Sequence, residues 1–113
     1  MRKAFILNSC STCTRIMKEL NWQDDVQNIK EKNIDAKTLD WAATQLGGYE
    51  ALFSRRAMKY RSLGLNTQAL SEKDYRKWIL EEYTFLKRPV FVIGDQVFAG
   101  NTKKAIEAVR AAM

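Results

Sequence analysis

Two hydrophobic periods follow one another in the first third of the chain. Residues Ala4 to Leu7 form a short apolar run, which predicts a buried strand over Lys3 to Leu7. From Ser11 to Leu20 an apolar side chain recurs every three or four residues, which indicates a helix that buries one face. A polar stretch follows, and Val26 to Glu31 alternates weakly, as in a strand. This part of the chain therefore predicts a β-α-β unit. The inward helix face would carry Cys13, Ile16, Met17 and Leu20.

The middle of the chain carries helical patterns with recognisable ends. Asp35 can cap a helix that runs to Leu46, and Gly47-Gly48 would end it. Tyr49 to Phe53 predicts a short helix. Ser71-Glu72-Lys73-Asp74 has the capping-box pattern, and the helical period that follows it predicts another helix. The residues that give this period are Tyr75, Trp78, Ile79 and Glu82-Tyr83.

The last quarter of the chain predicts a hairpin and a final helix. Lys87 to Ile93 reads as a strand that opens with a proline, Gly94-Asp95-Gln96 as a turn, and Val97 to Ala99 as the return strand. Asn101 is expected to cap the last helix. Its inward face would carry Ala105, Ile106, Val109 and Met113.

The resulting order, β-α-β, several helices and then β-β-α, is the plan of a thioredoxin-like domain. We therefore predict an α/β fold with a mixed four-stranded sheet, in one domain of residues 1–113 with a helical insert at about residues 35–84. A length of 113 residues and a hydrophobic content of 46% fit one globular domain with a sizeable core. The apolar part of the start, Ala4 to Leu7, is too short for a signal peptide, and no run approaches the ~20 residues of a membrane span. A cytoplasmic protein without a membrane partner is expected.

The chain is basic, with 19 lysines and arginines against 13 acidic residues and a formal net charge of +6. At this size such an excess is typical of a solvated basic surface, so nucleic acid is not an expected partner. Four cations fall between Arg55 and Arg61. Because they repel one another, an anion or nearby carboxylates should compensate their charge.

The two cysteines, Cys10 and Cys13, form a C-x-x-C directly after the first predicted strand. In a cytosolic protein with a βαβ pattern this spacing indicates a redox motif. Cys10 would lie at the helix N-terminus, where free backbone N–H groups and the helix dipole favour a thiolate. Cys13, one turn into the helix, could resolve a mixed disulfide. We predict Cys10 as the nucleophile, titrating below ~7.5, and Cys13 as the resolving thiol kept protonated by burial.

Other interpretations of the pair remain open. Cys13 lies on the apolar helix face and could be a small core residue, in an inert scaffold. A structural zinc site needs four ligands, and two cysteines with no histidine cannot supply them in a monomer. We therefore expect no metal and no bound cofactor.

Arg88-Pro89 is the second candidate feature of the site. A proline at the start of a strand cannot donate to the sheet ladder. Thioredoxin-like folds place a cis proline there, facing the active cysteine, whereas an ordinary edge proline would be trans. Arg88 would then lie near Cys10, where its guanidinium could bind an oxyanion or a carboxylate of a substrate. An ordinary surface ion pair is the alternative for Arg88.

Four segments in register resemble the arsenate reductase family, which includes arsenate reductase ArsC, the regulator Spx and YffB-like proteins. They are Cys-Ser-Thr-Cys at residues 10–13, Leu-Phe-Ser-Arg-Arg at 52–56, Tyr-Arg-Ser-Leu-Gly-Leu at 60–65, and Leu-Lys-Arg-Pro-Val at 86–90 with Gly-Asn at 100–101. Together they span nearly the whole chain. The resemblance implies a thioredoxin-like fold with a helical insert.

The resemblance also implies roles for particular residues. Cys10 matches the family's nucleophilic cysteine, and Arg56 and Arg88 match two of three arginines that bind the oxyanion in its arsenate reductases; Arg55 replaces Arg56 if the register slips by one. The third arginine would fall near Ala99-Gly100, where the chain has none. Efficient arsenate reduction is therefore not expected.

The functional expectation is a thiol-dependent reductase that acts on a disulfide, a glutathione adduct or a small oxyanion. Pro89 completes the predicted substrate-binding set of Arg56 and Arg88, and glutathione or glutaredoxin would donate the electrons. The second cysteine is shared with Spx-like members, which use the pair as a redox switch and bind RNA polymerase. A redox-switched transcription regulator is therefore the alternative.

Overall fold

The predicted strands form one four-stranded sheet in the computed structural model, which describes residues 1–113. The sheet order is β2-β1-β3-β4, and the bounds are β1 Arg2–Ile6, β2 Asp25–Asn28, β3 Val90–Ile93 and β4 Gln96–Ala99. Strand β1 runs parallel to β2 and antiparallel to β3, and β3 and β4 form an antiparallel hairpin. The predicted α/β fold with a mixed four-stranded sheet is confirmed.

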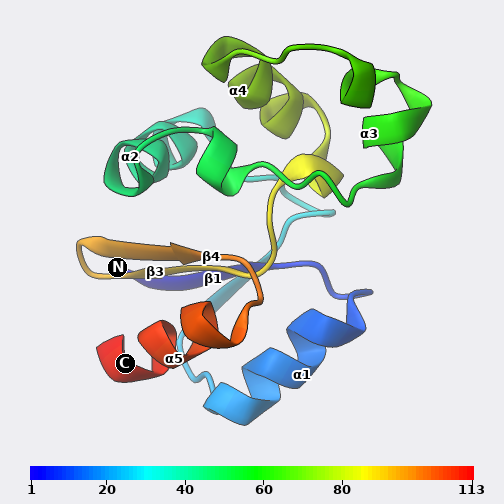
Figure 1. Ribbon diagram of the computed structural model, residues 1–113. Coiled ribbons are helices and arrows are strands. Elements are labelled where there is room, and N and C mark those ends of the chain that lie inside the picture. The colour runs from blue at the N-terminus through cyan, green and yellow to red at the C-terminus, as the bar shows by residue number, and fades with distance from the viewer. The chain divides into compact units, whose positions relative to one another are not determined.

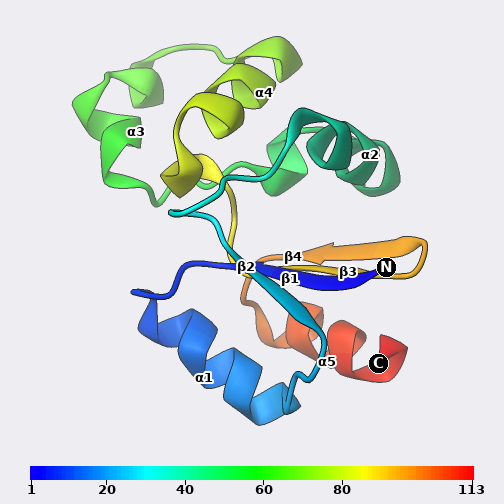
Figure 2. The same ribbon diagram turned by 180° about the vertical axis from the view of Figure 1, so that it is seen from behind.

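Strand β1 is an inner strand of the sheet and lies between β2 and β3; β2 is seen next to it in Figure 2. Its parallel pairing with β2 ends where Ile6 lies opposite Asn28. On the other side Arg2 lies opposite Ile93, at the end of β3. This register places the end of β1, and the loop that follows it, beside the end of β2.

The chain divides into two compact units. One unit consists of residues 1–33 and 88–113, and the other of residues 34–87. The helical insert that the sequence predicts at about residues 35–84 falls within the second unit. The first unit contains the whole sheet with α1 (Ser11–Leu20) and α5 (Lys103–Ala112). That the whole chain acts as a single domain stays a prediction.

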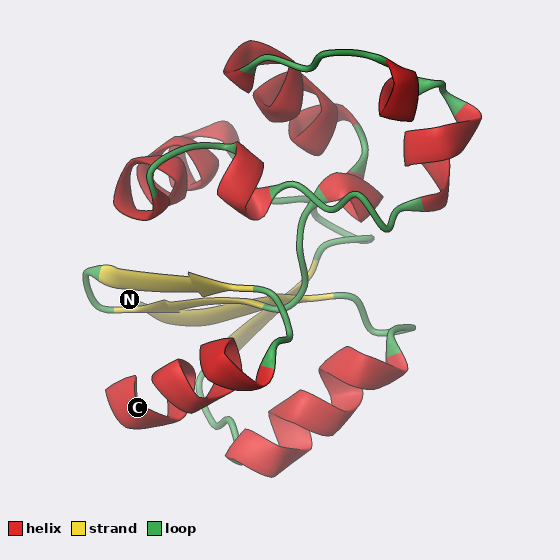
Figure 3. Ribbon diagram, viewed as in Figure 1, coloured by secondary structure: helices red, strands yellow, loops and turns green.

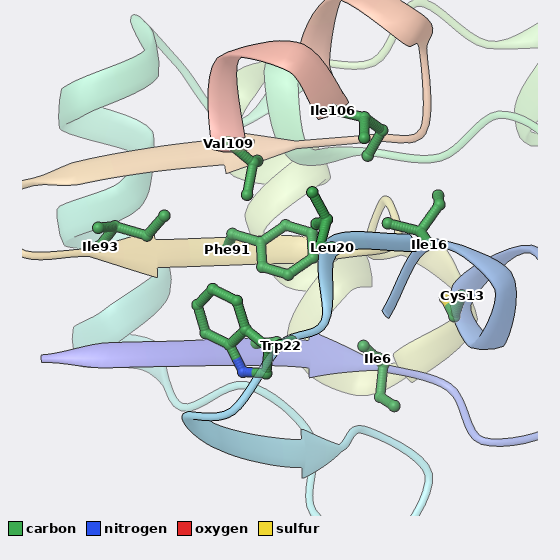
Figure 4. Close-up of a cluster of buried hydrophobic side chains, with 10 residues drawn as sticks. Ile6, Cys13, Ile16, Leu20, Trp22, Phe91, Ile93, Ile106 and Val109 are labelled. Atoms are coloured by element: carbon green, nitrogen blue, oxygen red, sulfur yellow. The ribbon is translucent and has the colours of Figure 1, made fainter. Parts of the chain in front are cut away.

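Helices α1 and α5 cover one face of the sheet in the first unit (Figure 1). Between them and the sheet lies a buried apolar cluster, in which Trp22 and Phe91 have ring centroids 5.0 Å apart (Figure 4). The other members are Ala4, Ile6, Cys13, Ile16, Leu20, Ile93, Ile106 and Val109. Burying one such aliphatic side chain stabilises the fold by about 1.5–3 kcal/mol. The cluster therefore fixes α1 against the sheet and with it the position of the helix N-terminus.

The second unit is helical (Figure 3). Its elements are α2 (Ala36–Leu46), α3 (Met58–Ser62), α4 (Glu72–Glu81) and the 3-10 helices Glu50–Leu52, Leu65–Thr67 and Tyr83–Phe85. The fully buried Phe53 ring is at its centre, stacked on Phe85 at 5.1 Å and tilted against Tyr75 at 4.9 Å. No helix of either unit has the length and apolar character that crossing a bilayer requires.

Polar contacts connect α2, α4 and the segment between them. Arg76 donates two hydrogen bonds to the Asp40 carboxylate, at 2.8 and 3.2 Å, and the Tyr49 hydroxyl donates a third at 2.6 Å. These bonds keep the pKa of Asp40 below its ordinary value. The Glu72 carboxylate accepts from the backbone N–H groups of Tyr49, at 2.6 Å, and Glu50, at 3.3 Å. The first turn of α4 thus anchors the segment that follows α2.

The caps of α2 and α4 are confirmed. Asp35 accepts the N–H of Thr38 at 3.0 Å, and Gly47 ends α2 in the left-handed region at φ 87°. Ser71 and Asp74 form the complete capping box of α4. Helix α1 has the predicted bounds, Ser11–Leu20.

Other expectations were wrong in detail. The last helix is capped by Thr102, whose hydroxyl accepts the N–H of Ala105 at 3.1 Å, and not by Asn101. Met113, predicted to face inward, is 40% exposed because it follows the last turn of α5. Strand β2 ends at Asn28 rather than Glu31, since the carbonyl of Asn28 accepts two N–H groups of a turn.

Candidate active site

The loop between β1 and α1 brings both cysteines to the start of α1. Leu7 to Cys10 forms a four-residue turn closed by a hydrogen bond of 2.9 Å from the Cys10 N–H to the Leu7 carbonyl. Cys10 is the N-cap of α1, with extended backbone angles (φ −87°, ψ 112°). Its carbonyl accepts the N–H of Thr14 at 3.1 Å, the first helical hydrogen bond. The predicted place of Cys10 at the helix N-terminus is therefore what the structure shows.

The surroundings of Cys10 favour the ionised form of its thiol. Its partial burial opposes ionisation, but the hydrogen bonds outweigh this and lower its pKa below the ordinary value. They come from the backbone N–H and the thiol of Cys13 and from the backbone N–H of Thr12, and the positive charge of Arg88 adds to them. Donors at a helix N-terminus stabilise a thiolate in this way. The direction agrees with the sequence-based expectation, although the hydrogen bonds contribute more than the arginine.

The Cys13 thiol has the opposite tendency. The residue is fully buried in the apolar cluster, and this burial raises its pKa to about 11. The Cys10 group raises it further through its hydrogen bond and its charge, while the backbone of Leu7 and Arg88 act against the rise. Neither cysteine is in a disulfide. The pair therefore combines one thiol that ionises easily with one that keeps its proton.

Arg88 and Pro89 precede β3, in the same unit as the cysteines. The Arg88-Pro89 peptide bond is cis, as a thioredoxin-like fold predicts. The carbonyl of Pro89 accepts the N–H of Gly100 at 3.0 Å, which joins the segment before β3 to the one after β4. The guanidinium of Arg88 acts electrostatically on both thiols. Arg88 thus influences the cysteine pair through its charge, whereas its binding of an anion stays a prediction.

Arg56 belongs to the second unit, where it is exposed in the turn before α3. Its role as an anion ligand beside Cys10 stays a prediction. Arg55, the alternative match, pairs with the Glu50 carboxylate at 2.5 Å and with the Tyr75 hydroxyl at 3.0 Å. Lys59 pairs with the Glu82 carboxylate. Carboxylates thus compensate the charges of two of the four cations between Arg55 and Arg61, which is one of the two kinds of compensation expected from the sequence.

The sequence analysis missed Asn28 as a residue of this site. Its side-chain oxygen accepts the backbone N–H of Asn8, at 3.2 Å, within the turn that leads to Cys10. The two residues are 20 positions apart, so only the pairing of β1 with β2 reveals the contact. No group of three histidine, cysteine, aspartate or glutamate side chains is arranged to hold a metal ion.

Comparisons with known proteins support the same fold. The chain is similar to the solved structure of a YFFB protein, with a TM-score of 0.82, 22% sequence identity, and coverage of 99% of this chain and 98% of that one. It is similar to an arsenate reductase from Vibrio cholerae, with a TM-score of 0.79, 19% identity and coverage of 99% and 97%. An ArsC-related protein from Brucella melitensis has a TM-score of 0.71, 20% identity and coverage of 95% and 92%.

These structural similarities establish the fold, which is thioredoxin-like as predicted. No curated protein sequence matches the chain. The family model described as "ArsC family" matches residues 5–109, which include both cysteines, Arg56, Arg88 and Pro89. The chain therefore belongs to the ArsC family.

Proposed function

We propose that this protein is a thiol-dependent reductase that acts on a disulfide or a glutathione adduct, with Cys10 as nucleophile and Cys13 as resolving thiol. The observation that carries the proposal is the opposite tuning of the two thiols, one with a lowered pKa and one with a pKa of about 11. Membership of the ArsC family, which includes arsenate reductases, supports it. Glutathione or glutaredoxin is the proposed electron donor.

The first step uses the Cys10 thiolate. It attacks one sulfur of the substrate disulfide, forms a mixed disulfide, and expels the other substrate sulfur as a thiolate that takes up a proton from water. Hydrogen bonds from the N–H groups of Thr12 and Cys13 hold the attacking sulfur at the helix N-terminus. Arg88, whose charge acts on the same sulfur, is the proposed partner of a substrate carboxylate such as those of glutathione.

The second step uses Cys13. Its buried thiol must first lose its proton to the solvent. The Cys13 sulfur then attacks the Cys10 sulfur, and the second substrate sulfur leaves as a thiolate that takes up a proton from water. Burial holds the pKa of Cys13 high, but the charge of the Cys10 thiolate, which adds to the rise, disappears in the mixed disulfide. Formation of the mixed disulfide therefore makes Cys13 easier to ionise. Two electrons pass from the pair to the substrate, and the donor returns them.

Oxyanion reduction is a narrower possibility of the same site. The resemblance to arsenate reductases implies three arginines that bind the anion, and the third would fall near Ala99-Gly100, where the chain has no arginine. Loss of one charged contact to a transition state costs about 2–4 kcal/mol, or a factor of about 30 to 1000 in rate. We propose that arsenate is turned over weakly or not at all.

The test is a turnover assay with glutathione and glutaredoxin on a model disulfide and on arsenate. Wild type should reduce the disulfide, Cys10→Ser should be inactive, and Cys13→Ser should accumulate a mixed disulfide with glutathione that mass spectrometry detects on one peptide. Unchanged turnover in Cys10→Ser would refute the proposal. Absence of turnover, together with capture of RNA polymerase by only the oxidised or only the reduced protein, would favour the regulator that the resemblance offers as the alternative.

A further inference from the structure

Asn28 ends β2 and contacts the turn that carries Cys10. Its side-chain oxygen accepts the N–H of Asn8 at 3.2 Å. Asn8 is the second residue of the turn from Leu7 to Cys10, and the N–H at that position takes no part in the hydrogen bond that closes such a turn. Without Asn28 this N–H would have no protein partner in the structure.

The contact continues the sheet beyond its last main-chain bond. The parallel ladder of β1 and β2 ends with the Ile29 N–H donating to the Ile6 carbonyl at 2.9 Å, because the chain then turns and the Asn28 carbonyl accepts the N–H groups of Glu31 and Lys32. The Asn28 side chain supplies the acceptor that a longer β2 would have supplied from its backbone. The end of the sheet thus holds the start of the cysteine turn.

We infer that Asn28 is a positioning residue for the Cys10 thiolate. The Asn28 side chain accepts the Asn8 N–H, and the Leu7 carbonyl accepts the Cys10 N–H, so both ends of the turn are fixed. In this turn the Cys10 sulfur accepts hydrogen bonds from the N–H groups of Thr12 and Cys13. A looser turn lets the sulfur move off these donors. Asn28 is not among the groups that act on the Cys10 sulfur, so its effect passes through the turn. The importance of this residue for catalysis rests on the proposed function, but its effect on the thiol does not.

Asn28→Ala tests this effect because it removes the side-chain hydrogen bond to Asn8 and leaves the backbone bonds in place. The main-chain atoms of Asn28 keep their bonds to the turn and their register with Ile6. Gln27→Ala is the matched control: Gln27 is the preceding residue of β2, is equally half-buried, and donates from its side chain to the carbonyls of Lys32 and Asn33, at 2.7 and 3.0 Å, and not to the cysteine turn.

The measurement is the pH profile of iodoacetamide alkylation of reduced protein, read on the Cys10 peptide. We expect Asn28→Ala to move the profile to higher pH and to lower the alkylation rate about two- to fivefold on its acidic side, the equivalent of one weak hydrogen bond. Gln27→Ala should leave the profile unchanged. The Asn8 amide should exchange its hydrogen faster in Asn28→Ala, and as slowly as in wild type in Asn28→Asp, which keeps an acceptor oxygen.

Two results would overturn the inference. One is a wild-type profile in Asn28→Ala, and the other is an equal displacement in Gln27→Ala, which would show that any loosening of β2 suffices. Neither result touches the proposed function. That proposal fails separately, if Cys10 of the wild-type protein alkylates with the pH profile of an ordinary thiol.

Discussion

The buried thiol of Cys13 should make the stability of the reduced protein fall steeply in alkaline solution. In the folded state its pKa is about 11, about two units above the ordinary value, chiefly because the residue is fully buried. The folded state therefore holds this proton to higher pH than the unfolded state does. The stabilisation is fully present below the unfolded pKa of ~8.5–9 and is lost as the pH rises to about 11. Two units correspond to about 2–3 kcal/mol.

Cys13→Ala removes this titration, and among the other groups it changes chiefly that of Cys10, to which the Cys13 thiol donates. At pH 8 the variant should be less stable than wild type by about 1 kcal/mol, because a buried group of methyl size is deleted. Wild type should then lose stability faster with rising pH, so that the two curves cross between about pH 9 and 10 and the variant is the more stable protein near pH 11. The measurement is urea unfolding under reducing conditions at half-unit steps from pH 8 to 11.

Cys10→Ala is the second control for this experiment. It leaves Cys13 buried but removes the neighbouring group whose hydrogen bond and charge add to the rise of the Cys13 pKa. Its alkaline loss of stability should therefore be shallower than that of wild type. A difference between wild type and Cys13→Ala that stays constant from pH 8 to 11 would refute the reasoning, since the thiol would then titrate alike in both states.

Three further predictions concern other contacts. Arg88→Ala should raise the pKa of Cys10, whereas Arg15→Ala should not, since Arg15 pairs with a carboxylate on the next turn of α1; alkylation profiles that are alike in the two variants would contradict this. Phe53→Ala should lower the free energy of unfolding by about 3–5 kcal/mol, and Phe53→Leu by less, because the ring is fully buried among aromatic neighbours. Ser71→Ala should cost about 0.5–2 kcal/mol in urea unfolding by removing the cap of α4, and a loss below this range would show that the capping box is dispensable.

The sequence predicted those features whose cause is local. The cap at Asp35, the capping box at Ser71 and the period of α1 depend on residues within one or two turns, and all three are found. The cap of α5 was missed because Asn101 and Thr102 are both good N-cap residues, and only the backbone path shows that Thr102 accepts the Ala105 N–H. Helix α3 was missed because it buries no side chain and so has no apolar face to recognise.

The candidate site was predictable in part for the same reason. The place of Cys10 follows from the helix start that comes after it, and the direction of its pKa follows from the free N–H groups there. The contact of Asn28 with Asn8 depends on strand pairing between distant residues, for which the sequence carries no short-range signal. The hydrogen bonds lower the pKa of Cys10 more than the charge of Arg88 does, and this ranking likewise depends on distances that the sequence does not give.

The pairing of β1 with β3 also has a consequence for the order of folding. Arg2 lies opposite Ile93, so the central pair of the sheet forms only after a closure of about ninety residues, whose entropic cost precedes any gain from the sheet. Residues 34–87 are continuous and compact, and they shorten this closure if they collapse first. During synthesis the thiol-bearing helix would emerge long before β3 completes its sheet. Its cysteines would meanwhile be exposed to oxidants and to other nascent thiols, and early collapse of the middle segment would shorten the time until β3 pairs with β1.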